Sequence, residues 1–457
     1  MNDEVAVGQL ACGMLETLDA ESIRQRVSMA GVVGAGGAGF PTAVKLQAQV
    51  EIFLVNAAEC EPMLKVDQQL MPRQAARLVR GLLYGMAATG AREGVIALKE
   101  KYQEAISTLE PLLPPHIRLH ILPDIYPAGD EVITIWLTTG RRVPPAGLPG
   151  NVGVVVNNVQ TLLNVARAVE QQWPVTRRTL TINGAVARPL TVTVPLGVTF
   201  REMLALAGGA TIPDPGFING GPMMGQLVTD LDQPVTKTSG GLLVLPGNHP
   251  LIRRRMRDDR SILAVARTVC EQCRLCTELC PRHLIGHELA PHLIVRAVNY
   301  QQVSKPEILL NALICSECSL CESVACPVDI SPMRINQMLK KQLRAQGARY
   351  QGILQAVDPM AKYRLVPTKR LVSKLDLTNW YQAAPFYEKT YQPKQVIIPL
   401  RQHIGVAALP SVAVGDNVNL GQCIGTVPDK TLGAPVHASI CGKVTAVNKS
   451  GVTIMRS

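Results

Sequence analysis

The sequence has few aromatic residues and lacks an apolar run long enough to cross a bilayer. Phe, Trp and Tyr make up only 4% of the 457 residues, whereas Gly and Pro number 37 and 33. A chain so rich in turn-forming residues is expected to carry much of its chemistry in loops. Since no stretch of about 20 apolar residues is present, we expect no membrane span. Asp3 and Glu4 stand where a secretory signal would be basic, so we expect no such signal.

The sequence also lacks a concentrated basic patch, although its formal net charge is +11. The densest basic stretch, residues 253–260, contains Asp258 and Asp259, and no nucleic-acid-binding motif is present. We therefore expect no nucleic-acid partner, whereas an acidic redox partner or an anionic cofactor would suit a basic surface. Twelve cysteines in a chain expected in the cytoplasm indicate metal ligation rather than disulfide bonds.

Two cysteine runs, each followed by proline, carry the strongest functional signal. They are Cys270, Cys273, Cys276 and Cys280, and Cys315, Cys318, Cys321 and Cys326. Three cysteines at intervals of three can wrap one corner of a cubane, and in two-cluster ferredoxins the fourth cysteine of each run ligates the other cluster. We therefore predict two 4Fe-4S clusters, one held by Cys270, Cys273, Cys276 and Cys326, the other by Cys315, Cys318, Cys321 and Cys280.

The second run departs from the usual spacing by one extra residue before Cys326, and we expect a small bulge to absorb it. The alternative interpretation of both runs is a pair of zinc sites. Structural zinc sites more often use two-cysteine knuckles separated by longer loops, which favours clusters.

The pattern of apolar residues predicts an α/β multidomain fold. Strands are predicted at Ile52–Val55, Val95–Leu98 and Val152–Val156, with helices between them. Runs at Thr179–Ile182 and Leu190–Val194 predict a hairpin, and Thr199 with Glu202 predicts a capped helix after it. The predicted division is an amphipathic helix (1–20), an α/β domain (21–177), a small β-plus-helix domain (178–247), a helical cysteine domain (255–347), an irregular linker (348–393) and a compact β domain (394–457).

A glycine-rich loop lies near the start of the predicted α/β domain. Gly34, Gly36, Gly37 and Gly39 precede Phe40, and small residues of this kind let backbone amides cradle a phosphate. The loop lacks the lysine-serine ending of a P-loop, so nucleotide hydrolysis is not indicated. Taken alone, this loop is equally consistent with a flexible turn.

The segment Asn56-Ala57-Ala58-Glu59-Cys60-Glu61-Pro62, at the end of the next predicted strand, adds to this loop. Together they resemble the flavin-binding domain shared by the flavoprotein subunit of respiratory complex I and the C subunit of the Rnf electron-transport complex. The resemblance implies that the loop wraps FMN, that Lys45 contacts its phosphate end, and that Asn56, Glu59 and Glu61 lie beside the isoalloxazine and the nicotinamide. Glu59 and Glu61 would orient flavin and nicotinamide rather than act as general acids or bases.

Two further segments belong to this resemblance. Gly129 and Glu131 match the glycine-acid segment near the flavin, and Asn157, Asn158 and Thr161 match the segment whose asparagine pair helps to hold FMN. An aromatic residue that stacks on NADH in the complex I subunit is replaced here by Ala48. The resemblance therefore implies FMN binding more directly than a particular NADH pose.

The C-terminal residues 399–405 and 434–438 resemble the barrel-sandwich hybrid domain found at the opposite end of the Rnf C subunit. Residues 178–247 match the soluble-ligand-binding β-grasp domain of the same family. Lys430 does not match the carrier lysine of lipoyl domains, which favours a structural or docking role for the barrel. This domain order resembles the cobalamin reductases of propanediol-utilisation microcompartments.

The resemblance implies that NADH gives a hydride to FMN, which passes single electrons through the two clusters to cobalamin. It implies a corrinoid adenosyltransferase as partner, possible contact with a shell protein, and a place in a bacterial microcompartment. The apolar stripe of the predicted N-terminal helix motivates a separate prediction, that residues 1–18 are the targeting segment, and its alternative is a helix docked on the protein's own core. Two alternatives stay open. One is an Rnf-like NADH dehydrogenase subunit that reduces a ferredoxin or a partner subunit, and the other is a non-enzymatic electron conduit.

Overall fold

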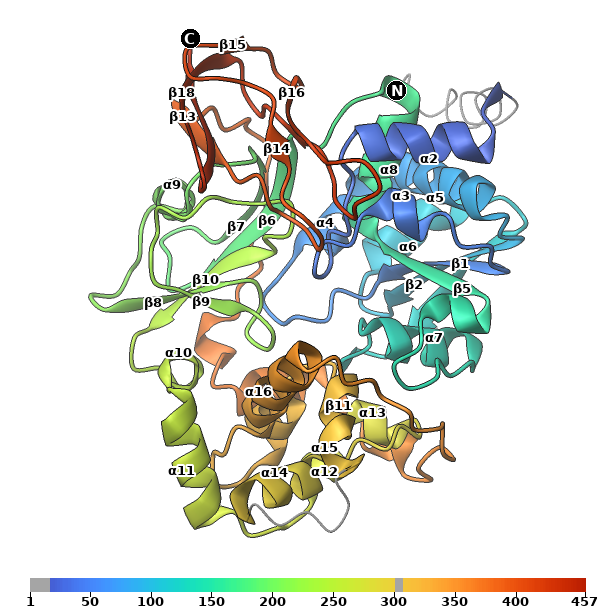
Figure 1. The fold of residues 1–457 in the computed structure, drawn as a ribbon, viewed down its shortest axis with the longest axis vertical. Coiled ribbons are helices and arrows are strands. Elements are labelled where there is room, and N and C mark those ends of the chain that lie inside the picture. Colours follow the sequence, from blue (N-terminus) through green and yellow to red (C-terminus); the bar gives the residue numbers. More distant parts are fainter. Residues whose placement is uncertain (1–16, 301–306) are drawn as a thin grey trace.

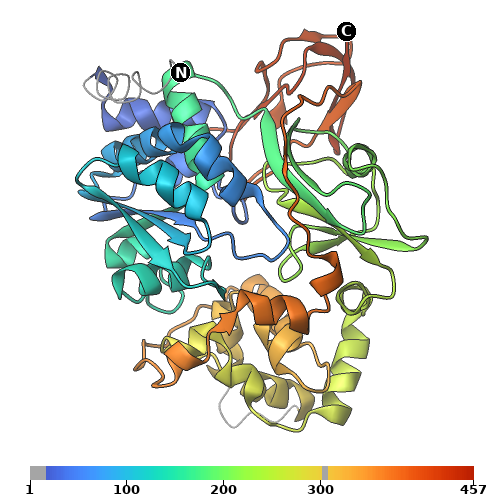
Figure 2. The same ribbon diagram turned by 180° about the vertical axis from the view of Figure 1, so that it is seen from behind.

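The computed structural model describes residues 17–300 and 307–457, arranged as lobes around a central junction (Figure 1). Seen from behind, the α/β domain and the β-grasp domain lie side by side above the helical cysteine domain, and the barrel lies at the top (Figure 2). The predicted helix over residues 1–20 falls almost entirely outside the described residues. Within the described part, no helix is both long and apolar enough to cross a membrane.

The α/β domain has a four-stranded parallel sheet in the order β3-β2-β1-β5. Alternate residues of β1 face two different cores: Phe53 and Val55 pack in one, Ile52 and Leu54 in the other. The strands are β1 (Ile52–Ala57), β2 (Glu93–Lys99), β3 (Ile117–Leu122) and β5 (Val154–Asn158). The helices are α2 (Ala20–Met29), α3 (Thr42–Lys45), α4 (Val66–Arg73), α5 (Ala75–Thr89), α6 (Gln103–Leu109), α7 (Glu131–Thr139) and α8 (Val159–Gln171), with short turns η1 (Glu110–Leu112) and η2 (Pro149–Val152).

The three predicted strands are present, and β3 is an additional edge strand that the sequence analysis missed. Its polar residues Arg118 and His120 interrupt the apolar run, because an edge strand is less fully covered than the central strands. Since all four strands run parallel, their carboxyl ends meet at one edge of the sheet, where α/β proteins usually bind ligands. Asn56, Asn157 and Asn158 lie at this edge.

The β-grasp domain has a six-stranded sheet in the order β12-β7-β6-β10-β8-β9. The predicted hairpin is confirmed, because β6 and β7 pair antiparallel, and so is the capping box of Thr199 and Glu202 at α9. The elements are β6 (Arg177–Gly184), β7 (Leu190–Pro195), α9 (Phe200–Leu206), β8 (Pro215–Asn219), β9 (Gln226–Val228) and β10 (Gly241–Pro246).

The cysteine domain is helical. Its elements are α10 (Pro250–Met256), α11 (Asp259–Val269), α12 (Leu275–Glu278), α13 (Pro281–Leu284), α14 (Pro291–Tyr300), α15 (Glu307–Leu310), η3 (Asn311–Ile314), η4 (Cys321–Ala325) and α16 (Pro332–Ala345). The turn η4 is a π-helix, whose hydrogen bonds span one residue more than those of an α-helix. It lies where the second cysteine run has its extra residue, so the predicted bulge is confirmed.

Residues 348–393, predicted as an irregular linker, run along two other domains. Strand β11 (Val366–Pro367) pairs with β4 (Ile125–Tyr126) of the α/β domain, and β12 (Phe386–Tyr387) adds a parallel strand to the β-grasp sheet. Between them lie α17 (Thr368–Lys374) and η6 (Thr378–Trp380), and η5 (Ala361–Tyr363) precedes β11. The segment therefore ties the two domains together.

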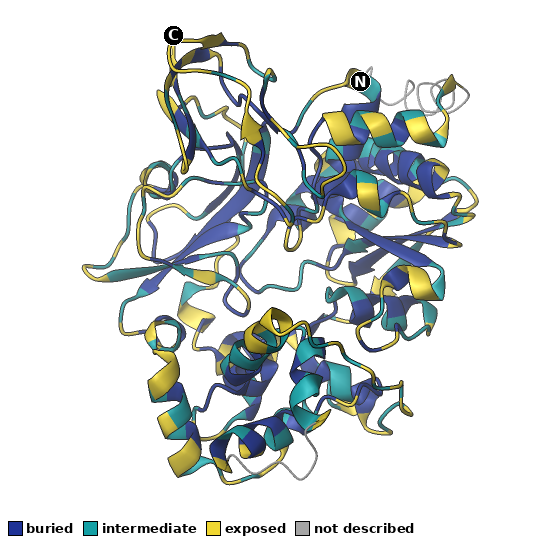
Figure 3. Ribbon diagram, in the orientation of Figure 1, coloured by how far each residue is buried: buried dark blue, intermediate teal, exposed yellow. Residues whose placement is uncertain are grey.

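The C-terminal barrel consists of two sheets in the orders β13-β19-β18-β15 and β14-β16-β17. Its inner side chains, such as Val396 and Ile454, share one apolar core with Leu180 and Phe200 of the β-grasp domain. The β-grasp sheet and the inner side of the barrel are therefore buried, whereas α11 has one exposed face (Figure 3). The barrel strands are β13 (Gln395–Ile398), β14 (Leu409–Pro410), β15 (Asn417–Val418), β16 (Cys423–Thr426), β17 (Val436–His437), β18 (Gly442–Asn448) and β19 (Gly451–Arg456).

Candidate functional site

The glycine loop, residues 34–39, connects α2 to the short helix α3. It is closed by a hydrogen bond in which the Gly34 N–H donates to the Phe40 carbonyl at 2.9 Å. A Cβ added to Gly37 would meet no protein atom within 4 Å, and Gly37 itself is exposed. The middle of the loop therefore presents open backbone that a ligand could approach closely.

Side chains from two other elements hold the loop from behind. The Ala35 N–H donates to Thr161 Oγ1 of α8 at 2.9 Å, and the Ala35 carbonyl accepts from the buried Arg178 of β6 at 2.7 Å. A Cβ at Gly36 would lie 3.2 Å from the Asn158 side chain. The structure therefore brings the predicted residues Gly36, Asn158 and Thr161 together.

The asparagine pair ends β5 at the carboxyl edge of the sheet. Asn158 Nδ2 donates to Asp67 Oδ2 at 2.6 Å, whereas the buried Asn157 Nδ2 finds no hydrogen-bond partner among the described residues. Buried amide groups rarely stay unpaired in native proteins. An unpaired donor at this edge fits a bound polar group such as a flavin.

The remaining predicted flavin residues form two contact pairs. Asn56 Nδ2 donates to the Gly129 carbonyl at 2.7 Å, and Lys45 Nζ pairs with Glu131 Oε1 at 2.6 Å. The segments around residues 56 and 129, which only the family resemblance assigned to one flavin site, are thus in contact. Lys45 is partly exposed, so an anionic ligand could compete with Glu131 for its ammonium group.

Glu59 and Glu61 both accept hydrogen bonds from backbone amides. The Glu59 carboxylate accepts from the first amides of α4, including the Asp67 N–H at 3.0 Å. The Glu61 carboxylate accepts from the Met223 and Met224 N–H groups at 2.9 and 2.7 Å. Burial raises the pKa of Glu61. Because both carboxylates accept hydrogen bonds from backbone amides, they are suited to positioning these segments rather than to transferring protons. Their role toward a flavin stays a prediction.

Asp67 and Arg178 are site residues that the sequence analysis missed. Burial raises the pKa of Asp67, and the nearby Glu59 carboxylate raises it further, which favours the protonated acid. Arg178 is a buried cation that contacts the glycine loop and interacts electrostatically with Asp67. The sequence gives little signal for Arg178, because it follows Arg177 in a strand that also contains Thr179, Thr181 and Asn183.

One group of four cysteines, the inner group, lines a small cavity. It consists of Cys280, Cys315, Cys318 and Cys321, all of which are buried. Cys280 comes from the first run and the other three from the second, so the structure places a cysteine of the first run beside the second run. Four thiols around one cavity form a donor set suited to a cubane.

A second group, the outer group, lines a cavity that opens to solvent. It consists of Cys270, Cys273, Cys276 and Cys326, and Cys273 is exposed. No three His, Cys, Asp or Glu side chains within residues 17–300 and 307–457 meet in a way that would hold a single metal ion. The two groups have the membership predicted from the spacing, and ligation by them stays a prediction.

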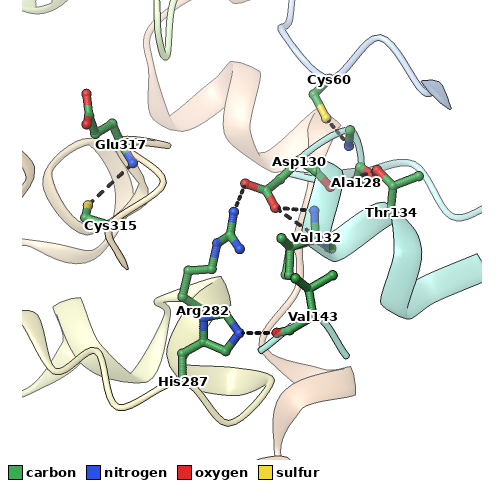
Figure 4. Close-up of polar contacts among 12 residues, drawn as sticks. Cys60, Ala128, Asp130, Val132, Thr134, Val143, Arg282, His287, Cys315 and Glu317 are labelled. Carbon is green, nitrogen blue, oxygen red and sulfur yellow. Dashed lines mark hydrogen bonds and ion pairs between the residues drawn. The ribbon is translucent and has the colours of Figure 1, made fainter. Parts of the chain in front are cut away.

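The inner group adjoins the α/β domain. Tyr126 Oη donates to the Cys318 carbonyl at 2.8 Å, and Tyr126, Cys60 and Cys318 belong to one packed core. Arg282, two residues after Cys280, forms an ion pair with Asp130 at 2.8 Å, and both side chains are largely buried (Figure 4). The inner group is therefore anchored to the domain that carries the predicted flavin residues.

A loop of the β-grasp domain, residues 220–225, lies between Glu61 and the inner group. Ser319 Oγ donates to the Met223 carbonyl at 2.9 Å, and Arg255 donates to the Pro222 and Gly225 carbonyls at 2.7 and 2.8 Å. A Cβ at Gly221 would lie 2.1 Å from Glu61 Oε2, so only glycine allows this approach. Three domains thus meet beside the inner group.

The chain matches four domain families. They are the Nuo51 FMN-binding domain (residues 27–167), the SLBB domain (179–227), a 4Fe-4S dicluster domain (269–331) and the RnfC barrel sandwich hybrid domain (384–456). Cobalamin reductase PduS of Salmonella typhimurium strain LT2 is 71% identical over 440 residues, which cover 96% of this chain and 98% of the relative. The chain belongs to the cobalamin reductase PduS family.

Two further relatives are similar to this PduS-family chain. Cobalamin reductase PduS of Citrobacter freundii is 69% identical over 96% of this chain and 97% of the relative. The Na(+)-translocating ferredoxin:NAD(+) oxidoreductase complex of Acetobacterium woodii has a C subunit that is 37% identical over 60% of each chain. The predicted resemblance to the Rnf complex and to cobalamin reductases is confirmed.

The family matches also decide between the two interpretations of the cysteines. The dicluster match spans all eight cysteines of both runs, so this PduS-family chain carries a two-cluster 4Fe-4S domain rather than a pair of zinc sites. The FMN-binding match contains the glycine loop, the asparagine pair and the segments around residues 56 and 129. These two matches support the cofactors expected from the sequence, FMN and two 4Fe-4S clusters.

Proposed function

We propose that this chain is an NADH-dependent reductase that delivers electrons to the cobalt of cobalamin. The observation that carries the proposal is the position of the two cysteine groups, one packed against the FMN-binding domain and the other open to solvent at Cys273. When bound, FMN converts a two-electron hydride donor into a source of single electrons, which 4Fe-4S clusters can carry. The cobalamin reductases similar to this chain support cobalamin as the acceptor.

Different parts of the chain would bind the flavin, fix the surrounding segments and hold the two clusters. The open amides of the glycine loop and the ammonium of Lys45 would hold the phosphate end of FMN, with the unpaired Asn157 amide available to its polar groups. Asn56 would fix the segment around Gly129 and Glu59 the start of α4, whereas Glu61 would fix the β-grasp loop. The inner group would hold the first cluster on the path and the outer group the last, because Cys273 of the outer group reaches solvent whereas the inner cysteines are buried.

The flavin site is tested by filling the open part of the glycine loop. Gly37→Val adds a side chain where the protein leaves space, so the fold should persist while FMN is lost. Gly150→Val, at another exposed glycine with no neighbour within 4 Å, is the matched control and should keep FMN. FMN content equal to wild type in Gly37→Val would contradict the assignment of the loop.

The acceptor is tested with NADH and either cob(III)alamin or ferredoxin under anaerobic conditions. Reduction of cobalamin in preference to ferredoxin supports the proposal. The second candidate, an Rnf-like NADH dehydrogenase subunit, is favoured by the similarity to the Acetobacterium woodii protein, and preferential ferredoxin reduction would establish it instead. The third candidate is a non-enzymatic electron conduit, and it would be established if dithionite bleaches the flavin but NADH never does. This control is needed because Ala48 stands where an aromatic residue is expected to stack on NADH.

The cellular context is part of the proposal. On the family resemblance alone, a corrinoid adenosyltransferase would receive reduced cobalamin, and the chain would lie inside a propanediol-utilisation microcompartment with possible contact to the shell. Deletion of residues 1–18 should abolish encapsulation of a fluorescent fusion, and unchanged encapsulation would refute a targeting role for this segment.

A further inference from the structure

We propose that Lys237 and the barrel loop 402–404 form a latch that holds the glycine loop in its ligand-binding shape. The proposal rests on the glycine loop being the flavin site, and it assigns the C-terminal barrel a role at a site to which it contributes no predicted ligand. Lys237 is a positioning residue in this account. Three sets of contacts lead to it.

The first contact lies three residues before the glycine loop, at Gly31. Lys237 lies in the β-grasp domain and is 3% exposed, and its Nζ donates to the Gly31 carbonyl at 2.7 Å and to the Pro435 carbonyl of the barrel at 2.9 Å. Gly31 has a φ of +64°, and a Cβ there would lie 2.5 Å from the Pro435 oxygen. One ammonium group thus joins three domains at a point where only glycine fits.

The second contact is at the end of the loop. Gly39 has a φ of +75°, and a Cβ there would lie 2.8 Å from Thr238 Cγ2 and 3.1 Å from His403 Cα. The Ile404 N–H donates to the Gly39 carbonyl at 3.3 Å. The barrel loop and the residue after Lys237 therefore touch the second end of the glycine loop.

The third set of contacts joins residues 237–239 to the barrel loop 402–404 and to the glycine loop. The Lys237 N–H donates to the buried Gln402 Oε1 at 3.0 Å. Arg178 donates to the Ser239 carbonyl at 2.6 Å and to the Ala35 carbonyl at 2.7 Å. Residues 237–239 thus reach Gly31, just before the glycine loop, and Gly39, at its end, directly, and they reach Ala35 near its beginning through Arg178.

The chemistry of Lys237 suits a latch. Its Nζ partners among the described residues are carbonyl oxygens, and burial lowers its pKa to about 7. Both the ammonium and the neutral amine have enough N–H groups for two carbonyl acceptors, so the contacts persist in either state. The barrel shares an apolar core with the β-grasp domain, which fixes the Pro435 carbonyl relative to Lys237.

Hydrogen exchange of the amides of residues 34–39 tests the latch without any ligand. In full-length Lys237→Met, which keeps the stem and removes the donors, exchange of these amides should be about tenfold faster or more, and the FMN dissociation constant should rise by a similar factor. Gln402→Ala provides a milder variant should Lys237→Met fail to fold. Lys443→Met, an exposed lysine of the barrel, is the control and should change neither quantity.

Each outcome decides between the latch and the proposed flavin site. Folded Lys237→Met or Gln402→Ala protein with wild-type exchange and wild-type FMN affinity overturns the latch. If Gly37→Val loses FMN while the latch variants keep it, the flavin site is right and the latch is wrong. If Gly37→Val keeps FMN while exchange in the latch variants rises, the latch holds and the flavin assignment of the loop is wrong.

Discussion

Replacing Glu61 by Gln should loosen the contact between the FMN-binding domain and the β-grasp loop 220–225. The carboxylate accepts the Met223 and Met224 amides with two oxygens, whereas a glutamine side chain has a single acceptor oxygen. One amide would therefore lose a hydrogen bond to a charged group, roughly 1.5–3 kcal/mol. Protection of that amide against hydrogen exchange should fall roughly 10- to 150-fold, because each 1.4 kcal/mol is about a factor of ten.

The assay is hydrogen exchange followed by mass spectrometry on peptides that contain residues 220–225. Glu110→Gln, at an exposed carboxylate of the FMN-binding domain, is the control and should leave protection unchanged. Because Ser319 of the inner cysteine loop donates to the Met223 carbonyl, a smaller rise in exchange should also extend to residues 318–320. Unchanged protection at Met223 and Met224 in Glu61→Gln would refute the positioning role of this carboxylate.

Three further predictions concern groups of the site. Burial and Glu59 raise the pKa of Asp67 in the folded protein, whereas in the unfolded chain its pKa is about 4. As pH rises from about 4 toward neutral, the stability of the wild type should therefore fall relative to that of Asp67→Asn. Thermal midpoints of both proteins over pH 4–7 measure this, and a difference that does not change with pH would contradict it. On exposure to air, iron should be lost first from the outer group because Cys273 is exposed, and electron paramagnetic resonance that shows the inner signal vanishing first would contradict this. Arg282→Ala removes the ion-pair partner of Asp130, which keeps only its hydrogen bonds to the Val132 and Ile133 amides. The change should cost about 3 kcal/mol, the lower end of the cost of breaking a buried ion pair, and an unchanged thermal midpoint would contradict a stabilising role for this pair.

Local signals in the sequence predicted the parts of this protein that depend on local chemistry. The spacing of the cysteines predicted which thiols gather, and the one-residue insertion before Cys326 appears as a π-helical turn. Thr199 and Glu202 form the predicted capping box, since both partners lie within one turn. The bulge and the capping box need no information about distant segments, and the exchange of the fourth cysteine between the two runs follows from the pattern of two-cluster ferredoxins.

Contacts between distant segments were beyond sequence reasoning. Glu61 contacts residues more than 160 positions away, and Lys237 contacts Gly31 and Pro435 about 200 positions away on either side. Neither spacing nor periodicity marks such pairs, because the fold alone brings them together. The edge strand β12 was missed for a related reason: Phe386 and Tyr387 gain their strand pairing only from β7.

The relay through the inner group is the central claim, and single-turnover reduction by NADH in two cysteine variants tests it most directly. Electron paramagnetic resonance and flavin absorbance would be followed in Cys318→Ser, which alters the inner group, and in Cys273→Ser, which alters the outer group. We predict that NADH bleaches the flavin in both, that Cys273→Ser still shows a reduced inner cluster, and that neither variant reduces cobalamin at the wild-type rate. Cobalamin reduction at the wild-type rate by Cys318→Ser protein would contradict the account.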